Sequence, residues 1–450
     1  MRVAIVGGGA TGALAALHLA RLERGGAEII VIEPAEEIGR GMAYATDDPG
    51  HLLNVRVANM SAFADQSDHL FKWLQREGRG SGIPCPTPYC FVPRGVYGAY
   101  LAACVRNHIN CGEITHVRDR CVDVIESRHS VRIALESGNA IDAEIVVLAT
   151  GNEAKSVLGL PAAQPWTKDA LQEISGEAPV LIVGTGLTMV DMALSLDRQG
   201  HRGKITAVSP RGLLPSGHQP AKLVGLTDKE VPYGAEISEL MAWLRRFCLT
   251  NEVHDWRSAI DALRPYTQDL WRSMSLLQKR RFLRHARAFW EVHRHRMAPE
   301  VEKQVAGLRA SGRLEIVAGR VVHAQQRPEG VAIGLARRGQ KTIEKLRFSR
   351  LINCTGLGED PARSGNPLIR TLLARGTARV HPIGIGLDVH ENYALIDASS
   401  HCSRRVLAIG PLARAAFWES TAIPDIRMQC RRLTQMIDDA LQLHGLAEGV

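Results

Sequence analysis

The sequence contains no apolar run of the ~18 residues that would indicate a membrane-spanning helix. It also lacks a secretory signal, because Met1–Arg2 is followed by only a short apolar run, residues 3–6, that leads directly into glycines. These two absences favour a cytoplasmic protein with no membrane partner.

Paired Cys-x-x-Cys motifs are also missing, so a structural zinc site is not expected. His293 and His295 are two residues apart and do not share a helix face, and we expect no metal site. The nine cysteines are irregularly spaced, and reduced thiols are the default without a secretory signal. Cys85 and Cys90 have the spacing of a redox pair, but they lie in a proline-rich stretch, where we expect two loop cysteines.

The positive charge of the chain is also not concentrated in a nucleic-acid-binding motif. Its net charge is +8, which we attribute to a basic surface and to arginines that hold phosphate groups. Hydrophobic residues make up 45% and charged residues 23%, as in globular proteins. The 450 residues are enough for two or three folded domains.

A Gly-x-Gly-x-x-Gly motif follows the apolar run of residues 2–6 and precedes the helix-forming run of residues 13–20. Strand, glycine turn and helix in this order are typical of a dinucleotide-binding fold. Gly7 permits the tight turn, Gly9 lets a pyrophosphate approach the backbone, and Gly12 lets the helix lie close to the strand. The pattern therefore predicts a phosphate cradle near the N-terminus.

The helix that follows this motif would offer its free amide groups, from Ala10 and Thr11 onward, to the phosphates. A second apolar run, residues 28–32, ends at Glu33. This position is about 20 residues beyond the motif, where a carboxylate accepts hydrogen bonds from ribose. We expect FAD here rather than NAD, because the module begins at the second residue and another nucleotide module follows.

The second module repeats the order of the first. The apolar run of residues 179–183 leads into Gly184 and Gly186, and residues 190–196 predict a helix. The third glycine position holds Met189, so helix and strand cannot approach as closely there. The two glycines that a pyrophosphate needs are nevertheless present.

Leu187 and Thr188 stand in the predicted first turn of that helix and are expected cofactor contacts. Ser209 ends the next strand, at the place that Glu33 takes in the first module, and Arg211 lies two residues on. A carboxylate there would repel a 2′-phosphate, whereas a hydroxyl and an arginine would receive it. This predicts NADPH, with NADH the less favoured cofactor.

Two further apolar runs each end in Thr-Gly, at Thr150-Gly151 and at Thr355-Gly356. Each copy lies downstream of one glycine-rich module. Strands of this kind return the chain to a nucleotide-binding domain after an excursion, and their glycine allows the ligand to come close. The four residues are therefore expected cofactor contacts in a chain that interleaves its domains.

Taken together, these modules resemble the two-dinucleotide-binding-domain flavoproteins, a superfamily that includes glutathione reductase and the class B flavin monooxygenases. A closer resemblance is to a bacterial FAD/NAD(P)-binding oxidoreductase family. The segments that carry it are residues 39–44, 51–55, 59–61, 91–101, 184–191, 281–296, 408–412 and 417–422. The resemblance spans nearly the whole chain and implies FAD, NADPH and a redox reaction on a small-molecule substrate.

Disulfide reductases of this superfamily carry a Cys-x-x-x-x-Cys pair soon after the first ribose acid, and residues 38–47 contain no cysteine. Hydride transfer from NADPH to flavin is then expected, and we favour a monooxygenase that oxygenates a small molecule, by N-hydroxylation or a related reaction, through a flavin peroxide. One alternative is a reductase or dehydrogenase without productive oxygen use. Another is a non-catalytic protein that senses flavin or nucleotide.

The resemblance and the chemistry together imply contacts on the flavin. These expected contacts are Arg40, Asn54, Met60, Gly410, Pro411 and Leu412. Backbone amides of residues 410–412 would stabilise charge at flavin N1. Trp418 and Glu419 are expected to open the following helix and face the substrate, so the catalytic candidates are Asn54, Trp418 and Glu419. For His51 we expect a hydrogen-bonded loop histidine.

The predicted architecture is an α/β fold with two interleaved Rossmann-type dinucleotide-binding domains and a helical insertion at about residues 229–311. Residues 1–160 and 351–450 would form the FAD-binding domain, and residues 161–350 the NAD(P)-binding domain. Residues 278–296 hold seven Lys and Arg against one Glu. We expect the insertion to act as a lid or cap over the nicotinamide side. The alternatives are a homo-oligomer contact, a dock for an acidic partner, or a helical subdomain with a solvated basic face.

Overall fold

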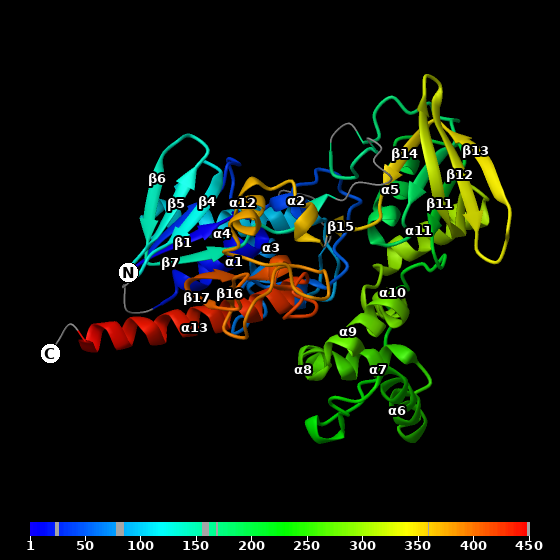
Figure 1. The fold of residues 1–450 in the computed structure, drawn as a ribbon. Coiled ribbons are helices and arrows are strands. Elements are labelled where there is room, and N and C mark those ends of the chain that lie inside the picture. Colours follow the sequence, from blue (N-terminus) through cyan, green and yellow to red (C-terminus); the bar gives the residue numbers. More distant parts are fainter. Residues whose placement is uncertain (23–26, 78–84, 155–161, 168–169, 359, 448–450) are drawn as a thin grey trace. The chain divides into compact units, whose positions relative to one another are not determined.

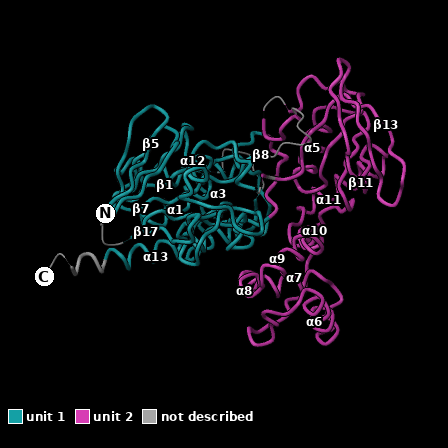
Figure 2. The backbone as a smooth tube through the Cα atoms, viewed as in Figure 1, with its two compact units in different colours: residues 1–47, 55–153, 359–450 teal, residues 48–54, 154–358 magenta. Residues whose placement is uncertain are grey.

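The computed structural model describes residues 1–22, 27–77, 85–154, 162–167, 170–358 and 360–447. It divides the chain into two compact units, coloured separately in Figure 2. Unit 1 comprises residues 1–47, 55–153 and 359–450, and unit 2 comprises residues 48–54 and 154–358. The predicted boundary at residues 160 and 161 lies outside the described residues.

Unit 1 is built on a six-stranded sheet. Neighbouring strands are parallel except β16 and β17, and the central strands are almost fully buried, as expected for Val- and Ile-rich sequences covered on both faces. In order across the sheet, the strands are β16 (Ala394–Ile396), β17 (Cys402–Ala408), β7 (Ile145–Leu148), β1 (Arg2–Val6), β2 (Glu28–Ile32) and β3 (Ile114–Val117).

Three helices of unit 1 matter for the candidate site described below. α1 (Ala10–Leu19) packs against both α4 (Arg94–Asn110) and α13 (Ile423–Ala447), so segments from both ends of the sequence lie side by side (Figure 1). The remaining elements are α2 (Gly41–Tyr44), η1 (Val57–Asn59), α3 (His69–Glu77), the antiparallel strands β4 (Cys121–Glu126), β5 (Val131–Leu135) and β6 (Ala140–Ala143), η6 (Pro361–Arg363), α12 (Pro367–Arg375) and η7 (Gly410–Ala413).

Unit 2 contains a second six-stranded sheet, in which four parallel strands continue into an antiparallel meander. In order, its strands are β13 (Ile343–Phe348), β12 (Gly330–Arg337), β11 (Leu314–Arg327), β10 (Ile205–Ser209), β9 (Val180–Val183) and β14 (Arg350–Asn353). α5 (Leu187–Arg198) connects β9 to β10. The short strands β8 (Glu153–Ala154) and β15 (Leu357–Gly358) pair separately.

The insertion predicted at about residues 229–311 is helical. It contains η3 (Asp228–Glu230), α6 (Ile237–Thr250), α7 (Trp256–Leu263), η4 (Arg264–Tyr266), α8 (Thr267–Ser273), α9 (Leu276–Arg281), the π-helical turn η5 (Phe282–Ala286), α10 (Arg287–Arg294) and α11 (Pro299–Ala310). Side chains cap the N-termini of some of these helices. Asp255 accepts from the amide of Arg257, and Ser275 and Gln278 form a capping box.

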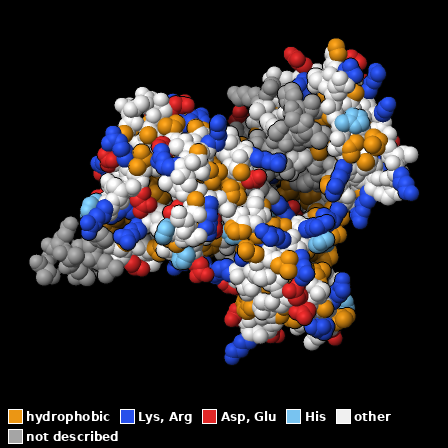
Figure 3. Space-filling view, in the orientation of Figure 1, with side chains coloured by type: hydrophobic (Ala, Val, Ile, Leu, Met, Phe, Trp, Pro, Cys, Tyr) orange, Lys and Arg blue, Asp and Glu red, His pale blue; other side chains and the backbone are white. Residues whose placement is uncertain are grey.

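The expected α/β class is confirmed, since each glycine motif lies between a parallel strand and a helix. No helix in the described part of the chain is both long and apolar enough to cross a bilayer. Figure 3 shows Lys and Arg side chains spread over the visible face of both units and interspersed with acidic ones.

Candidate functional site

The first glycine turn joins β1 to α1, and two of the three glycines at its motif positions are required by the fold itself. Gly7 has a φ of 102°, and a β-carbon there would lie 2.6 Å from the carbonyl oxygen of Ala149. A β-carbon on Gly12 would lie 1.8 Å from the carbonyl oxygen of Gly7. Both contacts are with backbone, so neither position accepts a side chain without displacing the chain.

Gly9 is different, because the fold leaves room for a side chain there. Its φ is −64°, and the nearest atom to an added β-carbon is the Cα of Gly41, at 3.6 Å. Gly9 is also the N-cap of α1 and, as a glycine, has no side chain with which to cap the helix. The first amides of α1, including those of Ala10 and Thr11, therefore face an open backbone surface that suits a phosphate.

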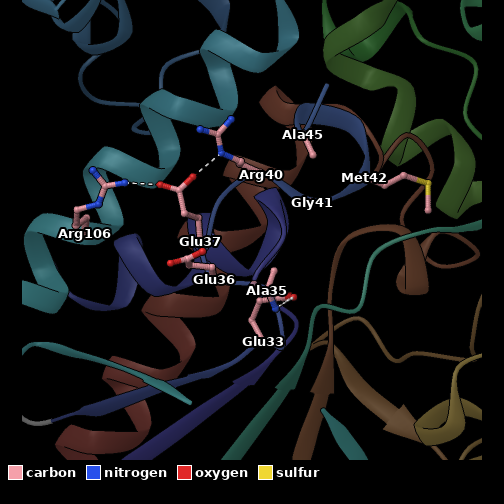
Figure 4. Close-up of a pocket in the computed structure, with 10 residues that line it drawn as sticks. Glu33, Ala35, Glu36, Glu37, Arg40, Gly41, Met42, Ala45 and Arg106 are labelled. Carbon is pink, nitrogen blue, oxygen red and sulfur yellow. Dashed lines mark hydrogen bonds and ion pairs between the residues drawn. The ribbon is translucent and has the colours of Figure 1, made fainter. Parts of the chain in front are cut away.

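Glu33 follows β2 beside this turn. One carboxylate oxygen accepts from the amide of Gly8 at 2.7 Å, and the other accepts from the amide of Ala35 at 3.0 Å. These two backbone donors orient the carboxylate. It lines a cavity of about 840 Å³, whose other lining residues are Gly8, Ala35, Glu36, Glu37, Arg40, Gly41, Met42, Ala45 and Arg106 (Figure 4). This volume is within the usual range of ligand pockets.

Glu37 holds two arginines at this cavity, as Figure 4 shows. It accepts from Arg40 Nε at 2.7 Å and from Arg106 on α4. The hydrogen bond from Arg40 is the main reason that the pKa of Glu37 is lowered. Sequence analysis identified Arg40 but missed Glu37 and Arg106, since no local pattern links α4 to the loop after β2.

In the second glycine turn, between β9 and α5, the first glycine is again required by the fold and the second is not. Gly184 has a φ of 111°, and a β-carbon there would lie 2.0 Å from the carbonyl oxygen of Cys354. An added β-carbon on Gly186 meets nothing within 4 Å. Gly186 is the N-cap of α5 and no side chain caps that helix, so the amides of its first turn, which holds Leu187 and Thr188, have an open approach.

Residues 4–153 match the model of a family described as FAD-NAD(P)-binding. The match covers the first glycine turn, Glu33 and the cavity. The resemblance expected from the sequence is confirmed. No curated protein sequence matches the chain.

The fold of the chain is similar to that of several solved structures. The ornithine hydroxylase of Pseudomonas aeruginosa is 14% identical with a TM-score of 0.68, over 98% of this chain and 99% of that one. The ornithine N-hydroxylase of Kutzneria sp. 744 is 15% identical with a TM-score of 0.67, over 97% and 99%. The L-lysine 6-monooxygenase of Pseudomonas syringae is 15% identical with a TM-score of 0.66, over 98% and 99%. At these identities the likeness shows a shared fold.

The Thr-Gly runs lie beside the glycine turns in both units. An added β-carbon on Gly7 would be 3.0 Å from the Cα of Thr150, and one on Gly184 would be 3.0 Å from the amide nitrogen of Thr355. Gly151 and Gly356 have φ values of 72° and 91°, a conformation that favours glycine. The structure thus brings each Thr-Gly pair to the cradle that its sequence position suggested.

The turn after β17 was expected to offer backbone amides to flavin N1, and the structure corrects this for Gly410. Its amide donates to Gln429 Oε1 at 3.1 Å, and its carbonyl accepts from Ser420 Oγ at 2.9 Å. Pro411 has no amide hydrogen. For Leu412, which lies within η7, the predicted contact stays a prediction. The sequence contained no signal for Gln429.

Trp418 and Glu419 lie between that turn and α13, so the expectation that they open the helix is wrong. Ile423 is the first residue of α13, which fixes both residues on a loop. Their exposed fractions are only 3% and 5%. Glu419 has a φ of 67°, an uncommon conformation for a residue other than glycine, and such strain often occurs at functional sites. Met60 is also buried, directly after η1.

The segment of residues 48–54 groups with unit 2, although the residues on either side of it in sequence belong to unit 1. His51 Nε2 lies 2.8 Å from Ser195 Oγ on α5, and that hydroxyl donates to Asp48 at 2.5 Å. His51 is buried and hydrogen-bonded, as expected. At the other end of the segment, the carbonyl oxygen of Asn54 lies 3.0 Å from His218 Nε2.

Ser209 ends β10, but its hydroxyl is engaged in the turn that follows. It accepts from the amide of Gly212 at 3.1 Å and lies 2.8 Å from the Thr185 hydroxyl. The Thr185 oxygen is also 2.5 Å from the carbonyl oxygen of Leu213. Because a carbonyl only accepts, the Thr185 proton goes to Leu213 and Ser209 donates to Thr185. The Ser209 proton is therefore not free for a phosphate, in contrast to our expectation.

Cys85 and Cys90 are joined by a disulfide, with 5.5 Å between their Cα atoms. The expectation of reduced thiols is therefore wrong for this pair, because the six-residue loop brings the two sulfurs together. Cys354 is buried beside the second glycine turn, and burial raises its pKa well above the usual range. It is therefore a thiol and not a reactive thiolate. Among the described residues, no cluster of three metal-ligating side chains occurs.

Proposed function

We propose that this chain is an FAD-dependent, NADPH-using monooxygenase that hydroxylates the nitrogen of a small amine. The similar structures support this proposal, since they are two ornithine hydroxylases and a lysine monooxygenase, and one contains reduced FAD, NADP+ and L-ornithine. A related cadaverine monooxygenase of Erwinia amylovora, 13% identical with a TM-score of 0.64, was solved bound to FAD.

The observation that carries the proposal is the matching pair Gly9 and Gly186. Neither glycine is required by its own backbone conformation or by a neighbouring atom within 3.5 Å. Both stand at an uncapped helix N-terminus, where a side chain would obstruct an approaching pyrophosphate. Two such cradles in one chain suit two dinucleotides, a flavin and a nicotinamide cofactor.

The residues of unit 1 fit FAD. The carboxylate of Glu33, oriented by the amides of Gly8 and Ala35, can accept from the adenosine ribose. The guanidinium groups of Arg40 and Arg106, both held by Glu37, place further hydrogen-bond donors at the same cavity. When bound, FAD would supply the two-electron chemistry that links NADPH to dioxygen.

The candidate substrate contacts are Asn54, Trp418 and Glu419. Glu419 is a buried carboxylate on the loop that follows the flavin-side turn, and its backbone is held in the left-handed region. A carboxylate of this kind would bind an ammonium group, which supports an amine as substrate. We also propose a cytoplasmic location, since seven of the cysteines are free thiols.

The test begins with purified protein loaded with FAD. Anaerobic mixing with NADPH should bleach the flavin absorbance. Oxygen is then admitted with ornithine, lysine or cadaverine, and hydroxylated amine is measured by mass spectrometry. Glu419→Gln should raise KM for the amine while NADPH still reduces the flavin, whereas the exposed control Glu391→Gln should change neither.

The other outcomes separate the rival functions. Bleaching followed by oxygen consumption without any hydroxylated amine would favour a reductase or dehydrogenase. Absence of bleaching with NADPH and with NADH would overturn the enzymatic proposal and favour a protein that senses flavin or nucleotide.

A further inference from the structure

We propose that the helical insertion completes the NADPH site, with Phe289 and the backbone of η5 positioning Arg211 for the 2′-phosphate. This inference rests on the proposed function. It assigns a role to the insertion and makes Phe289 a positioning residue that determines cofactor selectivity.

The end of β10 leaves Arg211 as the group that can select a 2′-phosphate. In a dinucleotide-binding module, the adenosine ribose lies beyond the end of this strand. The last residue of β10 is Ser209, so this position holds no carboxylate. The Ser209 hydroxyl is bound within its own turn, by Gly212 and Thr185. Discrimination between NADPH and NADH therefore depends on the charge of Arg211.

Arg211 is held by the insertion, 73 residues further along the chain. Its Nη2 donates to the carbonyl oxygen of Arg284 at 3.0 Å and lies 3.5 Å from that of His285. Both carbonyls belong to η5, the π-helical turn between α9 and α10 (Figure 1). A π-turn departs from the regular hydrogen-bond ladder of an α-helix, which leaves carbonyl oxygens open to an outside donor, and such turns are frequent at functional sites.

Phe289 on α10 supplies the second contact. The guanidinium carbon of Arg211 lies 5.4 Å from the centre of the Phe289 ring. Phe289 is 47% exposed, so part of its apolar ring lies at the surface of the insertion. The attraction between a cation and the face of an aromatic ring explains why phenylalanine occupies this position. Ring and carbonyls together restrict the orientation of the guanidinium.

The charge of Arg211 remains uncompensated, because in the described part of the chain no carboxylate pairs with it. The carbonyls and the ring are neutral, and guanidinium has five N–H donors, so further donors remain for a phosphate. Three other arginines, all in the insertion, are each paired with a carboxylate. Their carboxylate partners are Glu236 for Arg281, Glu291 for Arg287 and Asp261 for Arg296.

The experiment is isothermal titration of the FAD-loaded protein with NADP+ and, separately, with NAD+. Phe289→Ala should raise the dissociation constant of NADP+ about tenfold, as expected for loss of one cation–π contact and of the restraint on the guanidinium, and should change that of NAD+ less than twofold. Arg211→Ala should reduce NADP+ binding further, by about 30-fold or more, with the same small effect on NAD+.

Leu249→Ala is the matched control, because Leu249 is another exposed apolar residue of the insertion, on α6. It should leave both dissociation constants unchanged. The melting temperature of each variant is recorded, and Phe289→Leu, which keeps the apolar contact and removes the aromatic face, replaces Phe289→Ala if that variant unfolds. The leucine variant should show the same selective loss.

Equal losses for NADP+ and NAD+, or no loss in Phe289→Ala and Phe289→Leu, would overturn the inference, since a residue that only docks the insertion has no reason to distinguish the two nucleotides. If the wild-type protein prefers NADP+ and both Phe289 variants keep that preference, this inference alone is overturned. Wild-type protein that binds neither nucleotide would overturn the proposed function and this inference with it.

Discussion

Residue 12 cannot carry a side chain, because its β-carbon would lie 1.8 Å from the carbonyl oxygen of Gly7. This contact sets the distance at which α1 leaves β1. Gly12→Ala should therefore lower the free energy of unfolding by about 1–3 kcal/mol through overpacking against backbone. Thermal or denaturant unfolding of the FAD-free protein measures this loss. Gly307→Ala, in α11 with open space around it, should instead stabilise the protein.

Gly9 and Gly186 should respond in the opposite way to Gly12. Gly9→Val should leave the melting temperature of the FAD-free protein within a few degrees but abolish stoichiometric FAD, because the side chain fills the phosphate approach. Gly186→Val should retain FAD and lose NADP+. Flavin absorbance per protein and titration with NADP+ measure the two effects. A Gly9→Val protein that keeps one FAD per chain would show that the cradle is assigned to the wrong turn.

Glu33→Gln should weaken FAD binding by about tenfold or more, since a charge-assisted hydrogen bond to ribose contributes ~1.5–3 kcal/mol. The amide of glutamine also cannot accept from both Gly8 and Ala35, which hold the carboxylate now. The measurement is the dissociation constant of FAD by fluorescence quenching. Glu36→Gln is the control, because Glu36 lines the same cavity, and equal effects in the two variants would contradict the role of Glu33.

The Cys85–Cys90 disulfide predicts seven titratable thiols in the denatured protein and nine after reduction. Cys85→Ser should lower stability by about 2 kcal/mol, as loss of a short closed loop implies. Reducing agent should lower the stability of the wild-type protein by the same amount and should not affect the variant. Nine thiols without reductant would contradict the bond.

Stability should fall in mild acid because of His18. Its ring is buried, with Nε2 3.0 Å from the carbonyl oxygen of Ala62, and burial lowers its pKa below the ordinary 6.5. Below pH ~6.5 the unfolded chain takes up a proton that the folded protein resists, so the free energy of unfolding decreases as pH falls. Denaturant unfolding at pH 7.5 and 5.5 measures this difference.

His18→Gln should show a smaller loss between the same two pH values, whereas the exposed control His254→Gln should behave as the wild-type protein does. The same loss in His18→Gln as in wild type would assign the pH dependence to other groups.

The local features of both modules could be predicted from the sequence. Apolar runs predicted β1, β2 and β9, and the glycine spacing predicted the turns that join β1 to α1 and β9 to α5. Glu33 was found because it follows its strand directly. These features depend on the conformational preferences of neighbouring residues, which can be inferred from the order of those residues in the sequence. The start of α13 was mispredicted because helix boundaries depend on packing as well as on local sequence.

The tertiary structure decided which distant side chains meet. Gln429 takes the amide of Gly410, and Arg106 reaches Glu37 from another helix. Arg211 was predicted as a phosphate contact, but its attachment to η5 lies 73 residues away. No local pattern specifies these pairs, because each depends on how separate elements pack against one another. The sequence therefore determined the two nucleotide-binding modules by itself, and packing alone decided how their polar groups are oriented.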